Sequence, residues 1–168
     1  MALTAEQIRE LLQMKPHPIE GGYFVETYRS AQKFPEGLLA ASQQGERAVS
    51  TAIYYLLTPD TFSALHRLRG DEIFHFYLGD PVEMLQLAPD GTGLTILLGP
   101  DLAGGMRLQH TVPGGMWQGS RLVPGGQYAL LGTTMAPGFD ARDYESGRRE
   151  ELSAQYPHYA PRIALLTR

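Results

Sequence analysis

Two histidines and a glutamate stand close together in a segment that otherwise reads as buried β-structure. His66, Glu72 and His75 all lie between Ser63 and Pro81. Burying titratable side chains costs free energy unless something binds them, so this segment predicts the position of a site. Imidazole and carboxylate groups act as general acids and bases near neutral pH, and they also bind divalent transition metals. The segment therefore suggests two kinds of chemistry.

The spacing of these residues separates them into two groups. His75 comes three residues after Glu72, and successive side chains of a strand point to opposite faces of the sheet. If Glu72 faces an interior, His75 faces outward unless a bulge intervenes. The three residues are therefore a poor single set of metal ligands, and a metal-free cavity that binds an organic molecule is favoured. The alternative is a metal site that takes its third ligand from His75 or His110.

The composition is that of one globular domain spanning residues 1–168. The chain has 43% hydrophobic and 19% charged residues, with 19 glycines, 12 prolines and no cysteine. Abundant glycine and proline favour many short turns, and hence many strands, over a helical bundle. The lack of cysteine excludes disulfides and thiolate chemistry.

Charge and hydropathy restrict the partners and the compartment. The net charge is −4, and the arginines of residues 142–149 are interleaved with acidic residues, which is typical of a solvated surface. The sequence shows no clustered basic face of the kind that predicts nucleic-acid binding. There is no segment of signal-peptide type and no apolar run of roughly 18 residues that would span a membrane. We expect a cytoplasmic protein with no membrane partner.

Hydrophobic alternation and turn signals predict an all-β sandwich or barrel with one short N-terminal helix. The helix begins after Thr4 and ends before Pro16. Residues 31–47 predict a loop, and residues 141–155 are expected to be partly helical. Strands are predicted, with turn signals about every 8–12 residues, at 23–29, 49–57, 62–68, 72–78, 82–87, 94–98, 107–112, 128–135 and 162–166.

His66 with the segment 72–79, and the segment 113–118, together resemble the paired motifs of the cupin superfamily. Glu72 and the strand-ending Gly79 match the second half of the first motif, with His66 ahead of them. Residues 113–118, Pro-Gly-Gly-Met-Trp-Gln, match the Pro-x-Gly-x-x-His core of the second motif. Gln118 replaces its final histidine.

The resemblance extends over nearly the whole chain to one uncharacterised, single-domain branch of that superfamily, a domain of unknown function. Its fold is related to that of the dTDP-sugar epimerases. The segments that carry the match are 17–27, 50–54, 66–67, 71–77, 112–117, 136–139 and 166–167. The resemblance implies a cupin double-stranded β-helix (jelly roll), usually assembled as a homodimer.

The resemblance also assigns roles to residues. Metal-binding cupins use two histidines and a glutamate of the first motif and a histidine of the second, and Gln118 removes that last ligand. A divalent metal is therefore not favoured, and no metal-ligating residue is assigned. In the related epimerases a histidine removes a proton next to a carbonyl and a tyrosine delivers one. His66 is the corresponding base, and Glu72 would orient it or raise its basicity.

The partner acid and the walls of the pocket are less defined. Four tyrosines qualify as the acid, and spacing does not choose between Tyr23, Tyr55, Tyr77 and Tyr128. The candidate ligand-binding residues are Glu26, Tyr55, His75, Trp117 and Gln118. Among them, Trp117 is expected at the mouth of the barrel, where its ring would stack on a ligand.

Three functions follow from these residues. The first is a cupin that binds a sugar- or nucleotide-like small molecule, acting as an epimerase or isomerase with His66 as base. The second is a metal-dependent enzyme with His66 and Glu72 as ligands. The third is a non-enzymatic ligand-binding or structural dimer. The segment 32–47 either covers the pocket or joins the dimer contact.

Overall fold

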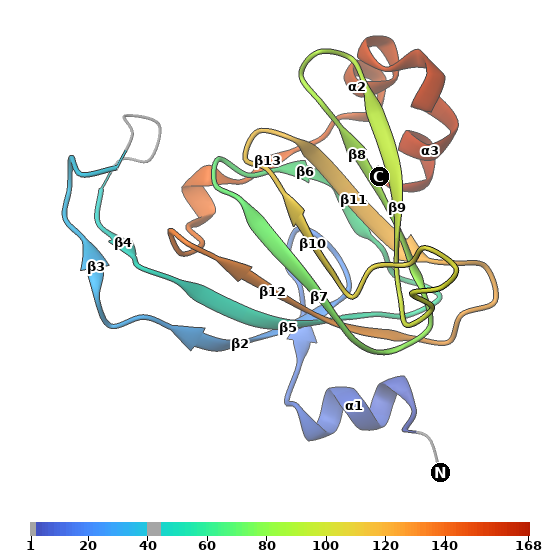
Figure 1. Ribbon diagram of the computed structural model, residues 1–168, viewed down its shortest axis with the longest axis horizontal. Helices are drawn as coiled ribbons and strands as arrows, with labels where there is room; N and C mark the ends of the chain where they lie inside the picture. Colours follow the sequence, from blue (N-terminus) through green and yellow to red (C-terminus); the bar gives the residue numbers. More distant parts are fainter. Residues whose placement is uncertain (1–2, 40–44) are drawn as a thin grey trace.

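The computed structural model describes residues 3–39 and 45–168, which form two facing antiparallel sheets with helices on their outer sides (Figure 1). The first sheet has six strands in the order β1-β2-β5-β12-β7-β10. Its strands are β1 (Lys15–Pro16), β2 (Tyr23–Arg29), β5 (Thr51–Leu57), β7 (Glu72–Gly79), β10 (Gln109–Val112) and β12 (Ala129–Met135).

The second sheet has five strands in the order β13-β6-β11-β8-β9. They are β6 (Ser63–Arg67), β8 (Val82–Leu87), β9 (Gly93–Leu98), β11 (Trp117–Leu122) and β13 (Glu145–Ser146). Because β6 and β7 follow each other in the chain but lie in different sheets, the His66 and Glu72 strands face each other across the interior. The all-β architecture with a short N-terminal helix that was expected from the sequence is confirmed.

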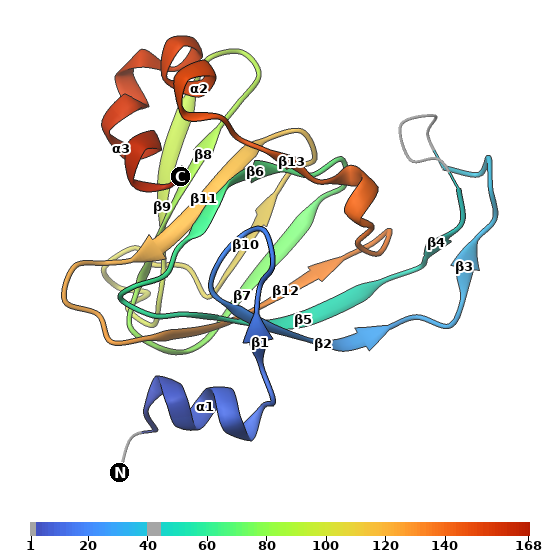
Figure 2. The same ribbon diagram turned by 180° about the vertical axis from the view of Figure 1, so that it is seen from behind.

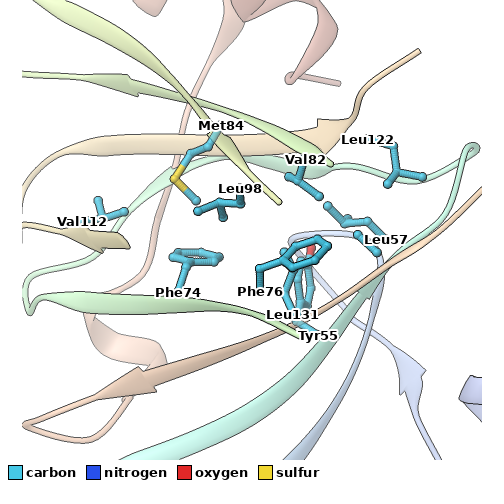
Figure 3. Close-up of a cluster of buried hydrophobic side chains, with 11 residues drawn as sticks. Tyr55, Leu57, Phe74, Phe76, Val82, Met84, Leu98, Val112, Leu122 and Leu131 are labelled. Atoms are coloured by element: carbon cyan, nitrogen blue, oxygen red, sulfur yellow. The ribbon is translucent and has the colours of Figure 1, made fainter. Parts of the chain in front are cut away.

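The space between the sheets holds an apolar core (Figure 3). Phe74 and Phe76 from one sheet meet Val82, Met84 and Leu98 from the other, and all are buried. In each strand these residues alternate with side chains that face outward, as the period of a strand requires. The core occupies one part of the interior and leaves the rest to polar side chains.

Helices cover the outer faces of both sheets (Figure 2). Helix α1 (Ala5–Leu11) begins at Thr4, whose side chain accepts a hydrogen bond from the Gln7 backbone, and it packs Ile8 against the six-stranded sheet. Helices α2 (Arg149–Gln155) and α3 (Ala160–Leu165) pack against the five-stranded sheet. Short 3-10 helices precede them at η1 (Ala141–Asp143) and η2 (Pro157–Tyr159). Within the described residues, no helix is long and apolar enough to cross a membrane.

Two predicted elements differ from the structure. The strand expected over 162–166 is wrong, because this segment lies in and just after α3. Ile163 lies in α3 and Leu166 directly follows it, and both reach the same apolar cluster, as residues three apart on a helix do. An apolar run this short does not distinguish a helix from a strand by periodicity alone.

The loop expected over 31–47 contains a short two-stranded ribbon. It consists of β3 (Lys33–Phe34) and β4 (Arg47–Ala48) and projects away from the sheets (Figure 1). The middle of this segment, residues 40–44, lies outside the described residues. None of the described residues from 31 to 47 lines the interior cavity described below.

Candidate active site

A cavity of about 160 Å³ occupies the polar end of the interior. It is enclosed by strands of both sheets and by the segments that lead into β2 and β13. The lining side chains include two histidines, three glutamates and a tyrosine: His17, Glu20, Glu26, His66, Glu72 and Tyr144. Apolar walls come from Phe24, Ile53, Leu68, Met135 and Phe139.

His66 is held with one ring nitrogen committed to the backbone. It is 1% exposed, and its Nδ1 lies 2.8 Å from the Ala64 carbonyl oxygen. A carbonyl oxygen only accepts hydrogen bonds, so Nδ1 carries the proton of the neutral ring and Nε2 carries the lone pair. No described residue hydrogen-bonds to Nε2, and the ring stacks on Tyr144 with centroids 4.8 Å apart. The fold therefore presents His66 as a base.

A bulge in β6 places Ser63 beside Glu20, which lines the cavity. Gln118 pairs with His66 and Ser120 pairs with Ser63, so β6 uses one residue more than β11 between these points. This irregularity turns Ser63 and His66 toward the same face although their spacing is odd. The Ser63 hydroxyl donates a hydrogen bond to Oε1 of Glu20.

His17 is fixed in the tautomer opposite to that of His66. The Glu20 backbone N–H donates to His17 Nδ1 at 2.9 Å, which leaves the proton of the neutral ring on Nε2. This nitrogen lies 3.8 Å from Oε2 of Glu20. Burial lowers the pKa of His17, so the neutral ring is favoured. The cavity thus has one imidazole with a free lone pair and one with a free N–H.

Glu72 is anchored from behind by an amide. It is 8% exposed, and Nε2 of Gln118 donates to its Oε2 at 2.7 Å. Burial is the main cause that raises the pKa of Glu72, with the nearby charge of Glu20 adding to it. No hydrogen bond joins Glu72 to His66 among the described residues, although the two groups interact electrostatically. The hydrogen bond that orients the His66 ring is the one to the Ala64 carbonyl.

The other predicted ligand-binding residues fall into two groups. Glu26 lines the cavity and is held by Arg29, whose Nε and Nη2 donate to its two oxygens at 3.0 and 2.7 Å. Gln118 supports Glu72, and its buried Oε1 has no hydrogen-bond partner among the residues that the structure describes. Tyr55 is buried in the apolar core, and its hydroxyl donates to the Gly21 carbonyl at 2.7 Å rather than lining the cavity.

His75 and Trp117 lie on outer faces, away from the cavity, so their assignment to the pocket is corrected. His75 follows strand alternation from Glu72, and its Nε2 lies 3.1 Å from the Thr134 hydroxyl on the outer face of the six-stranded sheet. Trp117 precedes the inward-facing Gln118, so its ring packs outside the five-stranded sheet against α2 and α3.

The tyrosine of the cavity is one that the sequence did not indicate. None of the four expected candidates, Tyr23, Tyr55, Tyr77 and Tyr128, lines the cavity, whereas Tyr144 does. It follows η1, in the segment whose mixed charges suggested a solvated surface. His17 and Glu20 also line the cavity and were not among the candidate site residues. The signal that could have indicated them is the resemblance of segment 17–27 to the cupin branch, in which both lie.

The segment that carries Tyr144 is partly buried because of one ion pair. Asp143 is 6% exposed and Arg47 is 3% exposed, and two hydrogen bonds join their side chains across 96 residues of sequence. The pair ties the base of the β3–β4 ribbon to the backbone just before Tyr144. It therefore helps to hold Tyr144 against His66.

The donor set does not fit a resident metal ion. No group of three histidine, aspartate or glutamate side chains that would hold one occurs in residues 3–39 and 45–168. His110, considered as a third ligand, contacts Gln86 and Arg107 instead. The Gln118 N–H directed at Glu72 also places a positively polarised group where a cation would bind.

Comparison with known proteins identifies relatives along the whole chain. Residues 6–147 match the family described as "Cupin superfamily (DUF985)". An uncharacterised protein of Saccharomyces cerevisiae is 32% identical over 157 residues, which cover 88% of this chain and 78% of the yeast protein.

Solved structures show the same relationship. A hypothetical protein from Leishmania major superposes with a TM-score of 0.88 at 34% identity, covering 98% of this chain and 99% of its own. A protein from Shewanella oneidensis gives 0.87 at 31% identity, covering 99% of both chains. An oxalate decarboxylase of Bacillus subtilis gives 0.53 at 13% identity over 91% of this chain and 37% of its own, a likeness of fold alone.

Proposed function

Since this chain belongs to the DUF985 branch of the cupin superfamily, we propose that its cavity binds a small, hydroxyl-rich, sugar-like molecule and isomerises it by proton transfer. The observation that carries the proposal is the buried His66, whose Nδ1 is bound to the Ala64 carbonyl and whose Nε2 is left without a described partner. A base needs this arrangement before it can accept a proton from a bound molecule.

The size and charge of the cavity support a small polyol. Its volume of about 160 Å³ is below the roughly 300–1,000 Å³ of pockets for drug-sized ligands, so only a small ring or chain fits. Glu20, Glu26 and Glu72 line it, and the Arg29 side chain is already bound to Glu26. Carboxylates accept hydrogen bonds from hydroxyl groups and repel anions.

The roles follow from the tautomers. His66 Nε2 takes a proton from a carbon next to a carbonyl, and the electrons of the broken C–H bond form the enolate. His17 donates its Nε2–H to the developing oxyanion. We assign the return proton to the Tyr144 hydroxyl, since burial raises the pKa of Tyr144 and keeps it protonated. The enolate electrons form the new C–H bond at the carbon that lost its proton, and the carbonyl is restored. Proton transfer from the His66 imidazolium to the Tyr144 oxygen then restores both groups.

The test is hydrogen exchange at carbon. The protein is incubated in D₂O with a panel of neutral aldoses and ketoses, and deuterium next to the carbonyl is followed by NMR. We expect exchange in at least one compound and a rate lowered about 100-fold or more in His66→Gln. The matched control is His75→Gln, a histidine on the outer face, which keeps the wild-type rate.

Two results would contradict the proposal. One is that no compound of the panel binds to the wild-type protein or exchanges hydrogen at carbon in its presence. The other is equal exchange in His66→Gln and wild type, which would show that the base lies elsewhere. Circular dichroism of each variant confirms that it is folded before its rate is compared.

A further inference from the structure

An open groove adjoins the cavity. It has a volume of about 560 Å³ and is lined by the turn after β6, by Gly114 and Gly115, and by residues 142–145. Leu68 and Tyr144 line both the groove and the cavity, so the two spaces share a wall. The function proposed above uses the inner side of this wall and leaves the groove without a role.

Two arginines that face the groove are held rigidly by carboxylates. Arg67 donates through Nε and Nη2 to Glu145 at 2.8 and 2.9 Å, and its guanidinium lies 4.6 Å from the centre of the Trp117 ring. Arg142 donates through Nε and Nη2 to Asp140 at 2.8 and 2.7 Å. Each therefore has a fixed orientation.

The remaining nitrogen of each of these two arginines is available. Nη1 of Arg67 and Nη1 of Arg142 make no hydrogen bond to any residue in the described part of the chain. Each Nη1 carries two N–H donors, and a guanidinium that is already oriented loses little conformational freedom on binding an oxyanion. The groove thus offers preoriented donors to an oxyanion.

The side chains that line the groove carry an excess of positive charge. The lining has three arginines, Arg67, Arg69 and Arg142, and two carboxylates, Asp143 and Glu145. Glu145 pairs with Arg67, Asp143 pairs with Arg69 and with the buried Arg47, and Arg142 pairs with Asp140. Asp71 accepts a hydrogen bond from the backbone N–H of Gly114 beside them. A local positive excess in a chain with a net charge of −4 is a feature that attracts anions.

We propose that this arginine groove binds a phosphoryl group, either as a free phosphate or as part of the molecule whose sugar-like portion occupies the cavity. Guanidinium donors arranged around an open space suit an oxyanion with several oxygens, whereas the acidic cavity does not accept one. The second form rests on the function proposed above and extends it to a phosphorylated substrate. In either form the groove itself is the anion site.

Trp117 provides a built-in reporter, because it is the single tryptophan of the chain and Arg67 lies over its ring. Inorganic phosphate and pyrophosphate are titrated into the full chain at constant ionic strength while Trp117 emission is recorded. We expect a saturable change that chloride does not produce. In Arg142→Gln, which leaves the Arg67–Trp117 contact in place, affinity should fall at least tenfold.

The matched control is Arg148→Gln. Arg148 is 74% exposed, pairs with Glu151 and does not line the groove, so this variant should bind phosphate like wild type. No saturable response in the wild-type protein would overturn the proposal. Equal weakening in Arg142→Gln and Arg148→Gln would also overturn it, because it would indicate general charge attraction only.

Further titrations separate the two sources of the phosphoryl group and the two proposals. A sugar phosphate that binds at least tenfold more tightly than phosphate supports one molecule spanning both spaces, whereas equal affinity supports a free phosphate in the groove. His66→Gln should retain phosphate binding, because His66 does not line the groove. If the wild-type protein binds phosphate but exchanges no hydrogen at carbon, only the function proposed for the cavity is refuted. A neutral sugar that still exchanges in a protein without phosphate binding would refute only the groove.

Discussion

The two ends of the barrel interior are built from the same strands but differ in polarity, since one end is a polar cavity and the other an apolar core. On β7, Glu72 faces the cavity while Phe74 and Phe76 face the apolar core. On β12, Thr133 lines the cavity and Leu131 packs in the core. Each strand therefore passes from polar to apolar along its inward face.

The apolar end stabilises the folded state, whereas the polar end lowers its stability. The apolar end removes large side chains from water, which is the main favourable contribution to folding. The polar end contains buried groups that lack full compensation, such as Gln118 Oε1 and Ser120 Oγ. It also contains Glu72, whose pKa is raised because burial disfavours its charge. Such groups are costly in a core and useful in a site.

The largest expected effect tests the apolar end. Phe74→Ala removes a side chain that is 2% exposed and should lower the free energy of unfolding by about 3–5 kcal/mol. Urea denaturation of the two proteins measures this difference. Tyr77→Ala, on the outer face of the same strand and 49% exposed, is the control with a change of about 0.5 kcal/mol or less. Equal effects of the two substitutions would remove the distinction between inner and outer faces.

An intermediate effect is expected at the polar end. Gln118→Leu keeps the approximate volume but leaves the buried Oε2 of Glu72 without its amide donor. We expect a loss of about 1–3 kcal/mol in the free energy of unfolding, again from urea denaturation. Gln109→Leu, an exposed glutamine on β10, serves as the matched control. A Gln118→Leu protein more stable than wild type would mean that this end of the interior is simply unfilled core.

The smallest effect is a pH dependence that sharpens the comparison. The pKa of folded Glu72 is raised above its ordinary value of 4.5, so its contribution to stability is complete below pH 4.5 and is lost as the pH rises through the folded pKa. Glu72→Gln does not titrate and keeps an acceptor for Gln118. Its stability relative to wild type should therefore increase with pH above 4.5 and then level off.

Thermal or urea unfolding of both proteins across this pH range measures the difference. The subtraction also cancels the opposite trend from His17, His75 and His110, whose lowered pKa values make both proteins less stable as the pH falls below 6.5. A difference between wild type and Glu72→Gln that is independent of pH would show that Glu72 is not desolvated in the folded state.

Much of this arrangement could be predicted from the chain. Period-two alternation located most strands, and the resemblance to the cupin motifs placed His66 and Glu72 in the interior of the barrel. The same alternation separated His75 from Glu72. It also predicts that Trp117 and Gln118 face opposite ways, which the expectation of a stacking role for Trp117 did not take into account.

The residues that could not be predicted come from connecting segments. His17 lies between β1 and β2, and Tyr144 lies between η1 and β13, so no periodicity marks either as inward-facing. Their placement depends on contacts distant in sequence, such as the Arg47–Asp143 pair that spans 96 residues. Local patterns carry no information about such contacts.

The amino-acid sequence by itself determined which residues of each strand share a face, because side-chain direction alternates with every peptide unit. Only the tertiary structure decided which faces meet and which nitrogen of each histidine is free. The His66 tautomer depends on the Ala64 carbonyl turned by the bulge, and the cavity exists because two sheets and two connecting segments converge there. The chemistry of the site is thus a property of the folded arrangement of groups that the sequence supplies separately.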